Sequence, residues 1–95
     1  MRFTCDNLVF STHALKAMIA RRLSFDGVAE VVKSGDIIAS YPMDKPYPSY
    51  LLLKFVNGNP LHVVVATNEE ENTCIIITAY EPDPEIWEPD FKRKK

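Results

Sequence analysis

Two runs rich in β-branched residues, separated by a short acidic segment, constrain the fold of this chain more than any other stretch. Residues 61–67 read Leu-His-Val-Val-Val-Ala-Thr and residues 73–80 read Thr-Cys-Ile-Ile-Ile-Thr-Ala-Tyr, with Asn-Glu-Glu-Glu-Asn between them. β-Branched side chains pack well on a pleated surface, and so short a connection favours antiparallel pairing. We therefore predict a β-hairpin over residues 61–80 at the centre of the fold.

The register of this hairpin can be predicted from side-chain type, because residues two apart on a strand share a face. If Thr67 pairs with Thr73, one face is wholly apolar. That face holds Leu61, Val63, Val65, Ile75, Ile77 and Ala79. His62 then lies near Thr78 and Tyr80 on the opposite face. We expect the apolar face to be buried and the opposite face to meet water.

A further strand is predicted over residues 50–56, followed by an Asn-Gly-Asn turn in which Asn and Gly tolerate positive φ angles. We expect all three turn residues to separate the two strands, so that Val56 faces Pro60. With that register, Lys54 lies beside His62 on the solvent-facing side of the sheet.

Two N-terminal helices are predicted over residues 12–22 and 25–34. Ser11, or the threonine after it, and Ser24 are suitable N-caps, and Gly35 is a suitable C-cap because Gly enters the left-handed region freely. Apolar residues recur at spacings of three and four, which gives each helix one stripe to bury. The stripes are Ala14, Leu15, Met18 and Ile19, and then Phe25, Val28, Val31 and Val32.

Together these elements predict an α+β fold in a single domain spanning residues 1–95. Two N-terminal helices pack on one face of a three- to four-stranded antiparallel sheet, to which Leu51 and Leu53 contribute apolar side chains. Residues 37–41 supply the weaker strand. Phe3 and the Leu-Val-Phe run at residues 8–10 form either a short strand or a packed arm.

Composition limits the classes of protein to which the chain can belong. At 95 residues with 46% hydrophobic content, it can bury one small core. No apolar run reaches the roughly 18 residues of a membrane helix, and the first residues do not resemble a secretory signal. Cys5 and Cys74 are far apart and fit no metal-ligand spacing. We expect two free thiols in a cytoplasmic protein without a metal or other cofactor.

The charge distribution is uneven along the chain. The net charge is −2, which argues against a protein that simply coats nucleic acid. Residues 36–91 hold ten acidic residues and two lysines, whereas residues 92–95 are all basic. A basic ligand or protein segment should therefore approach the middle of the chain, and a phosphate-bearing ligand should approach the helices or the tail.

The first candidate site consists of Lys54, His62, Thr78 and Tyr80, because the predicted register places all four on one face of the sheet. A neighbouring lysine lowers the pKa of a histidine, which suits a general base, and it can neutralise a phosphoryl oxygen. Such a set fits cleavage of RNA by its own 2′-hydroxyl without a metal. The alternative is an ordinary solvated sheet face.

Two other groups of residues have both a functional and a structural interpretation. The first group consists of His13, Arg21 and Arg22, which could border a groove for an anionic ligand. The structural alternative is that His13 is a packed polar residue and that the two arginines are cations that stabilise the end of the helix. Trp87 with Phe91 and the basic C-terminus either binds nucleic acid or closes the core.

Three blocks of the sequence resemble a bacterial and archaeal family of domains of unknown function. They are Ser11-Thr-His-Ala with Met18, Arg21 and Leu23-Ser24, then Pro60-Leu-His-Val-Val, and finally Ile76-Ile-Thr-Ala-Tyr with Pro82 and Trp87. The resemblance extends over residues 11–93. The family is itself similar to the RelE/ParE-like superfamily of toxin folds, in which two helices pack on an antiparallel sheet.

This resemblance implies a toxin-like RNA endonuclease that is inhibited by an antitoxin protein and cleaves RNA without a metal. The expected catalytic residues are His62 as general base, Lys54 and Arg21 as stabilisers of the phosphorane, and Tyr80. Lys54 is included because of the predicted register, and it is not part of the family pattern. The expected substrate-binding residues are His13, Arg22 and Trp87. Relatives that cut RNA on the ribosome are strongly basic, and the net charge of −2 departs from them. The alternative function is a non-catalytic protein-binding module on the same fold.

Overall fold

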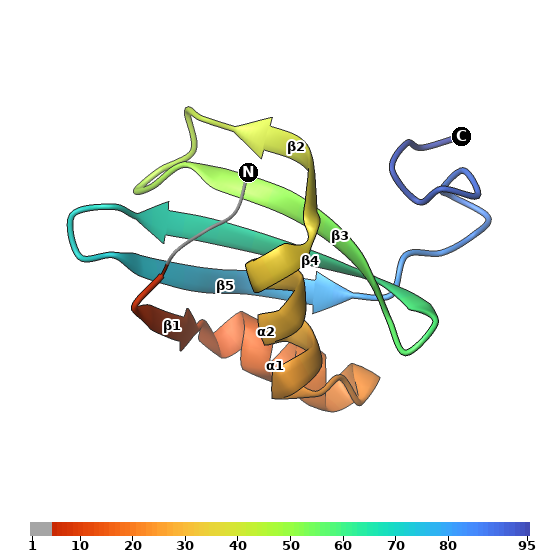
Figure 1. Cartoon of the computed structure of the whole chain (residues 1–95), viewed down its shortest axis with the longest axis horizontal. Helices are drawn as coiled ribbons and strands as arrows, with labels where there is room; N and C mark the ends of the chain where they lie inside the picture. Colours follow the sequence, from red (N-terminus) through yellow and green to blue (C-terminus); the bar gives the residue numbers. More distant parts are fainter. Residues whose placement is uncertain (1–4) are drawn as a thin grey trace.

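The computed structural model describes residues 5–95 and has two helices against one face of a five-stranded sheet (Figure 1). The elements are β1 (Asn7–Phe10), α1 (Thr12–Arg21), α2 (Phe25–Ser34), β2 (Asp36–Tyr41), β3 (Ser49–Val56), β4 (Asn59–Asn68) and β5 (Thr73–Tyr80). The strand order across the sheet is β1-β5-β4-β3-β2. The α+β prediction is confirmed. The prediction of a purely antiparallel sheet of three or four strands is wrong, because β1 adds a fifth strand that is parallel to β5.

The helix boundaries follow the predicted capping residues. Ser11 and Ser24 are the N-caps, and their side chains accept hydrogen bonds from the backbone N–H groups of Ala14 and Gly27. Gly35 ends α2, but for a different reason than predicted. Its φ of −74° is extended, and a Cβ atom there would lie 2.5 Å from the Val31 carbonyl oxygen. Gly35 is therefore needed for the close approach of the chain to the end of α2.

The predicted helix stripes are only partly buried. In α1 the buried residues are Ala14, Ala17 and Met18, whereas Leu15 and Ile19 are exposed. The stripe of α1 is therefore narrower than predicted and rotated toward Ala17. In α2 the valines of the stripe are buried as predicted, and Phe25 is exposed but packs edge-on against Phe10 of β1.

The turn between β3 and β4 is one residue shorter than predicted, and this shifts the register of β3. Val56 pairs with Asn59, so only Asn57 and Gly58 separate the strands. Both have positive φ angles, 52° and 83°, as a two-residue hairpin turn requires. Lys54 therefore pairs with Leu61 instead of lying beside His62. A shift of one residue moves every β3 side chain to the other face of the sheet.

A β-bulge in β5 alters the second predicted register. Val64 pairs with Thr78 and Val65 pairs with Ile76, which leaves Ile77 as an extra residue. The bulge lies where α1 begins, because the Ser11 hydroxyl donates to the Ile77 carbonyl oxygen at 3.1 Å. Val63 is fully buried as predicted, but Ile77 is 38% exposed. The prediction that Ile77 lies beneath the helices is wrong.

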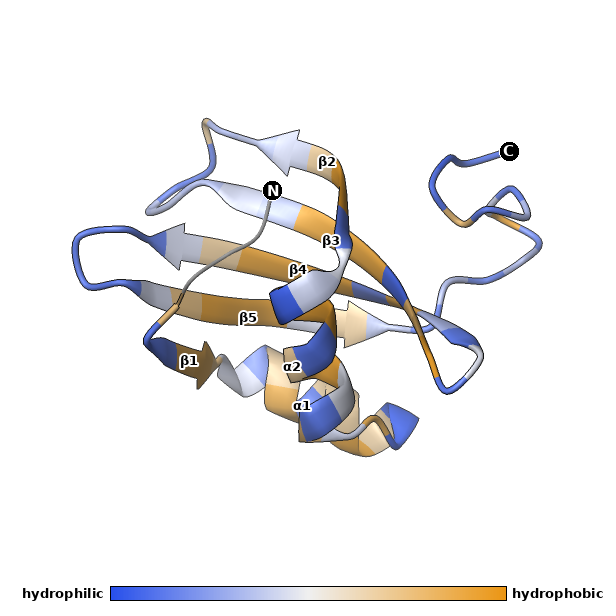
Figure 2. Ribbon diagram, viewed as in Figure 1, coloured by the Kyte–Doolittle hydropathy of each residue, from blue (hydrophilic) through white to orange (hydrophobic). Residues whose placement is uncertain are grey.

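The residues buried between the helices and the sheet consequently differ from the predicted set. Orange, hydrophobic positions follow β3, β4 and β5 and parts of both helices (Figure 2). The sheet residues of this core are Leu52, Leu61, Val63, Val65, Cys74, Ile76 and Ala79. Leu51 and Leu53 were predicted in this core, but they lie on the opposite face together with His62. Within residues 5–95, no helix is long and apolar enough to cross a membrane.

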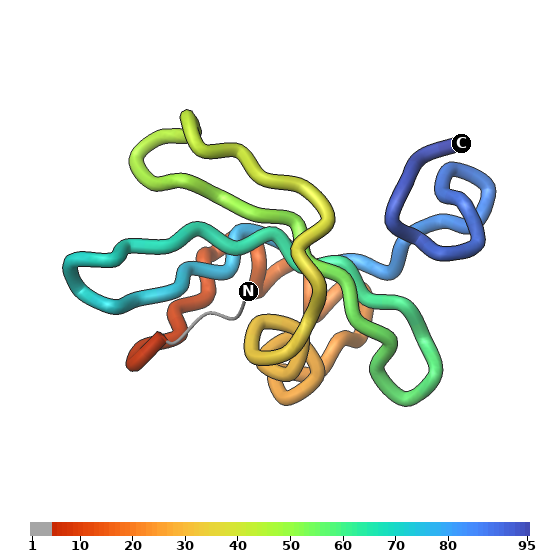
Figure 3. The backbone as a smooth tube through the Cα atoms, turned by 45° about the horizontal axis from the view of Figure 1, so that its top comes forward, coloured from red at the N-terminus to blue at the C-terminus, as the bar shows by residue number. Residues whose placement is uncertain are grey.

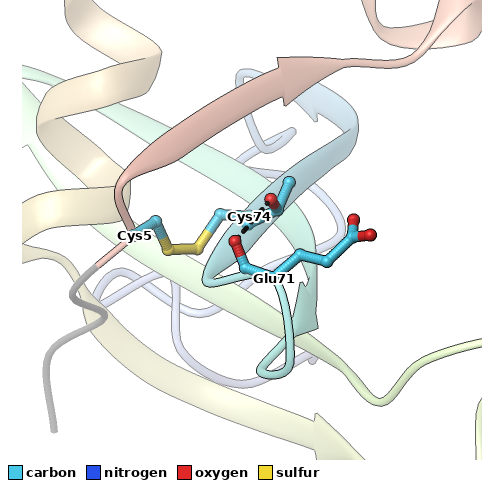
Figure 4. The surroundings of a disulfide bond; sticks show 4 residues. Cys5, Glu71 and Cys74 are labelled. Atoms are coloured by element: carbon cyan, nitrogen blue, oxygen red, sulfur yellow. Dashed lines mark hydrogen bonds between the residues drawn. A yellow bond between two sulfur atoms is a disulfide. The ribbon is translucent and has the colours of Figure 1, made fainter.

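A disulfide links the segment before β1 to β5. The Cα atoms of Cys5 and Cys74 lie 5.7 Å apart, and the two residues are bonded (Figure 4). The prediction of two free thiols is therefore wrong. Disulfides are commonest in oxidising compartments, so this pair gives no support to a cytoplasmic location. Of the predicted N-terminal arm, residues 8–10 form β1, and Phe3 lies outside the described residues.

Candidate functional site

The C-terminal residues 82–95, which we call the strap, lie against the sheet face opposite the helices. The strap leaves the end of β5 and turns back on itself (Figures 1 and 3). Its backbone closes locally, because the N–H groups of Glu88 and Lys95 donate to the carbonyl oxygens of Arg93 and Ile86. Trp87 is only 8% exposed, which agrees with the structural interpretation that it closes the core, whereas its neighbour Ile86 is exposed.

His62 of β4 is fully buried beneath the strap. Its Nε2 atom lies 2.8 Å from the carbonyl oxygen of Phe91, and its Nδ1 atom lies 3.2 Å from the hydroxyl of Tyr80. The Trp87 ring meets the imidazole edge-on, with 4.5 Å between the ring centroids. The structure therefore brings together three of the predicted site residues, His62, Tyr80 and Trp87. His62 and Trp87 are buried there and Tyr80 is half-buried, so the prediction of an exposed His62 is wrong.

These contacts define which ring nitrogen carries the proton when His62 is neutral. A carbonyl oxygen can only accept, so Nε2–H donates to Phe91, and Nδ1 then accepts from the Tyr80 hydroxyl. Burial lowers the pKa of His62 from its ordinary value of 6.5, and the hydrogen bond to Phe91 offsets part of that effect. Burial also raises the pKa of Tyr80, with a smaller contribution from Tyr41. His62 is therefore a structural link whose two ring nitrogens are both engaged in hydrogen bonds.

Lys54 lies on the other face of the sheet from His62. Its ammonium group donates to the Ser34 hydroxyl and lies 3.3 Å from a carboxylate oxygen of Glu30, both on α2. Lys54 therefore joins β3 to α2. The predicted pairing of Lys54 and His62 in one patch is wrong, because the two-residue turn shifts β3 by one position.

The remaining predicted site residues on and directly after α1 are His13, Arg21 and Arg22, and they differ in their surroundings. The Arg21 guanidinium donates to the Ala79 carbonyl oxygen at 3.3 Å. Pairing between β1 and β5 ends at Ile76, so Arg21 occupies the edge of β5 beyond β1. His13 and Arg22 are exposed to solvent. Arg22 follows α1 in the left-handed conformation, with a φ of 56°.

Beyond the strap, the same sheet face is partly uncovered and apolar, and we call this area the open face. Its residues follow from the strand pairings and keep partial exposure: Val9, Ala39, Tyr41, Val64, Ile75 and Thr78. Val9 and Tyr41 are 47% and 45% exposed. The sequence prediction missed this surface. A two-residue Asn-Gly turn, applied strictly, would have assigned Leu51, rather than Leu52, to the side of His62.

The fold defined by these elements is an α+β domain with both helices on one face of a mixed sheet. A family model described as a domain of unknown function (DUF4258) matches residues 10–81. The chain therefore belongs to this family. The match covers both helices and β2 to β5 and ends before the strap, so Trp87 lies outside it. No curated protein and no solved structure shows significant similarity to the chain.

Proposed function

We propose that the chain is a non-catalytic protein-binding module, with a RelE-like arrangement of helices and sheet, that binds a partner segment on the open face. The observation that carries this proposal is the partial exposure of side chains on the neighbouring strands β1, β5 and β4, with Ala39 and Tyr41 of β2 beyond the buried Leu51 of β3. Val64 and Thr78 pair in the middle of this area, and Ile75 and Val9 pair at its β1 side. A contiguous apolar surface of this kind marks interaction sites more often than ordinary protein surface.

The charges around the open face favour a basic partner. The loop between β4 and β5 holds Glu69, Glu70 and Glu71, and Ile75 of the open face follows shortly after it. The three glutamates and Tyr47 help to line a pocket of about 520 Å³. A segment with apolar side chains and flanking lysine or arginine residues would complement this surface, whereas nucleic acid would be repelled. An antitoxin protein with such a segment would be one partner of this class.

Binding of defined peptides tests this function. We expect a fluorescent peptide of alternating leucine and lysine to bind the full chain. A leucine–glutamate peptide should bind at least about tenfold more weakly, because Glu69, Glu70 and Glu71 repel its carboxylates. Thr78→Lys should weaken binding of the first peptide by about tenfold. Ile19→Lys adds the same charge at an exposed position of α1 and should leave binding unchanged. Fluorescence anisotropy at two salt concentrations provides the measurement. Equal binding of both peptides, or equal effects of the two substitutions, would contradict the proposal.

The second candidate function is the toxin-like, metal-independent RNA endonuclease. The exposed side chains of Lys16 and Arg22 favour it, because they leave cationic groups free to meet phosphate, and His13 of α1 is exposed as well. His62 would not be its general base, since it is fully buried and both of its ring nitrogens are engaged in hydrogen bonds. RNA cleavage that is lost in His13→Ala and kept in Lys54→Ala would establish this function in place of the binding module.

A further inference from the structure

The strap covers the part of the sheet face that adjoins the open face, and it does so with a small set of side chains. Trp87 packs on His62, Phe91 packs edge-on against Phe55 with 6.0 Å between ring centroids, and Lys92 lies 3.7 Å from the Asp36 carboxylate. Two aromatic anchors and one lysine therefore hold the strap on β2, β3 and β4.

We propose that the strap is an internal ligand, and that the surface beneath it is a docking site for a partner segment with aromatic and basic side chains, which displaces the strap on binding. This inference rests on the proposed binding function and names the class of segment that the site takes. The strap supports this choice of partner, because the side chains by which it contacts the surface are the aromatic Trp87 and Phe91 and the basic Lys92.

The way in which the strap is attached supports displacement. The backbone N–H groups of Trp87, Glu88 and Lys95 all donate to carbonyl oxygens of the strap itself. The strap therefore holds its own shape, and among the described residues its contacts with the sheet are made by side chains and by the Phe91 carbonyl. The Lys92–Asp36 pair is half-exposed on both sides, and such pairs contribute little. Segments attached in this way open without unfolding the rest of a domain.

The surface beneath the strap is suited to an aromatic side chain. Leu53 pairs directly with His62, and both are buried there, while Phe55 lies two residues further along β3 on the same face. Asp36 pairs with Leu53 at the margin and supplies the negative charge. This surface and the open face are continuous along β4, from His62 to Val64, so a longer partner segment could cover both.

The test uses a dye-labelled peptide with the sequence of residues 82–95. Trp87→Ala in the full chain should loosen the strap and raise the affinity for this peptide at least about tenfold over that of the wild-type chain. Ile86→Ala is the matched control, because Ile86 is an exposed strap residue, and it should behave like the wild type. Equal peptide binding by the wild type and Trp87→Ala, or no binding by a folded Trp87→Ala chain, would overturn the proposal.

Hydrogen exchange in the wild-type chain measures the opening of the strap without any substitution, and it applies even if Trp87→Ala does not fold. The amides of Glu88 and Lys95 should exchange at least about tenfold faster than those of Val63 and Val65 through a local opening that is insensitive to denaturant. Exchange of all four amides only through global unfolding would overturn the proposal. The leucine–lysine peptide reports on the open face independently, so failure of the binding function is distinguishable from failure of this inference.

Discussion

Val63→Asp is expected to unfold the chain, whereas Ile77→Asp is expected to leave it folded. Val63 is fully buried between the sheet and the helices, and an unpaired carboxylate there costs about 3–5 kcal/mol or more. Domains of this size have a total free energy of unfolding of about 5–15 kcal/mol. Ile77 is the extra residue of the bulge and is 38% exposed, so its carboxylate would keep contact with water.

Thermal denaturation followed by circular dichroism measures both variants on the same scale. The two substitutions introduce the same charge on adjacent strands, so their difference reports the environment of each position. The bulge predicts a large loss of melting temperature for Val63→Asp and a small loss for Ile77→Asp. Similar losses in both variants would mean that Ile77 faces the helical core and that the bulge is absent.

His62→Ala is expected to lower the free energy of unfolding by about 2–4 kcal/mol. The substitution leaves a cavity under Trp87 and removes the donor that satisfies the Phe91 carbonyl oxygen. Lys54→Ala is the matched control, and its cost should stay below about 1 kcal/mol because the Lys54–Glu30 pair is partly exposed.

Urea denaturation provides the free energies for this comparison. The emission of Trp87, the single tryptophan of the chain, should also shift to the red in His62→Ala as the strap loosens. A His62→Ala chain with wild-type stability and unchanged emission would show that His62 does not hold the strap.

Local signals in the sequence predicted the helices well. Ser11 and Ser24 are N-caps because their side chains can accept from the first turn, which depends only on nearby residues. The position of Gly35 was predicted correctly, but its physical reason depends on the Val31 carbonyl and could be identified only from the structure. Leu15 and Ile19 show the limit of periodicity, because spacing alone does not determine which side of a helix meets the sheet.

The candidate site was harder to predict because its geometry depends on registers that shift by single residues. The sequence signal for the Asn57-Gly58 turn was present but was applied with one residue too many, and this placed Lys54 on the wrong face. The bulge at Ile77 arises where the start of α1 meets β5, and a strand pattern does not contain that contact. The burial of His62 depends on the strap, which returns from a distance of about 30 residues in the sequence.

The role of His62 as the buried link beneath the strap is tested most directly by following its ring nitrogens by NMR as the pH falls. Burial lowers its pKa in the folded chain, so the unfolded chain binds more protons below about pH 6.5. The stabilisation from His62 is therefore complete above that pH and is lost as the pH falls through the folded-state pKa. We predict a neutral ring with its proton on Nε2 at pH 6.5, and protonation only at lower pH together with a red shift of Trp87 emission. Protonation at or above pH 6.5 with unchanged Trp87 emission would contradict this role and would reopen a catalytic function for His62.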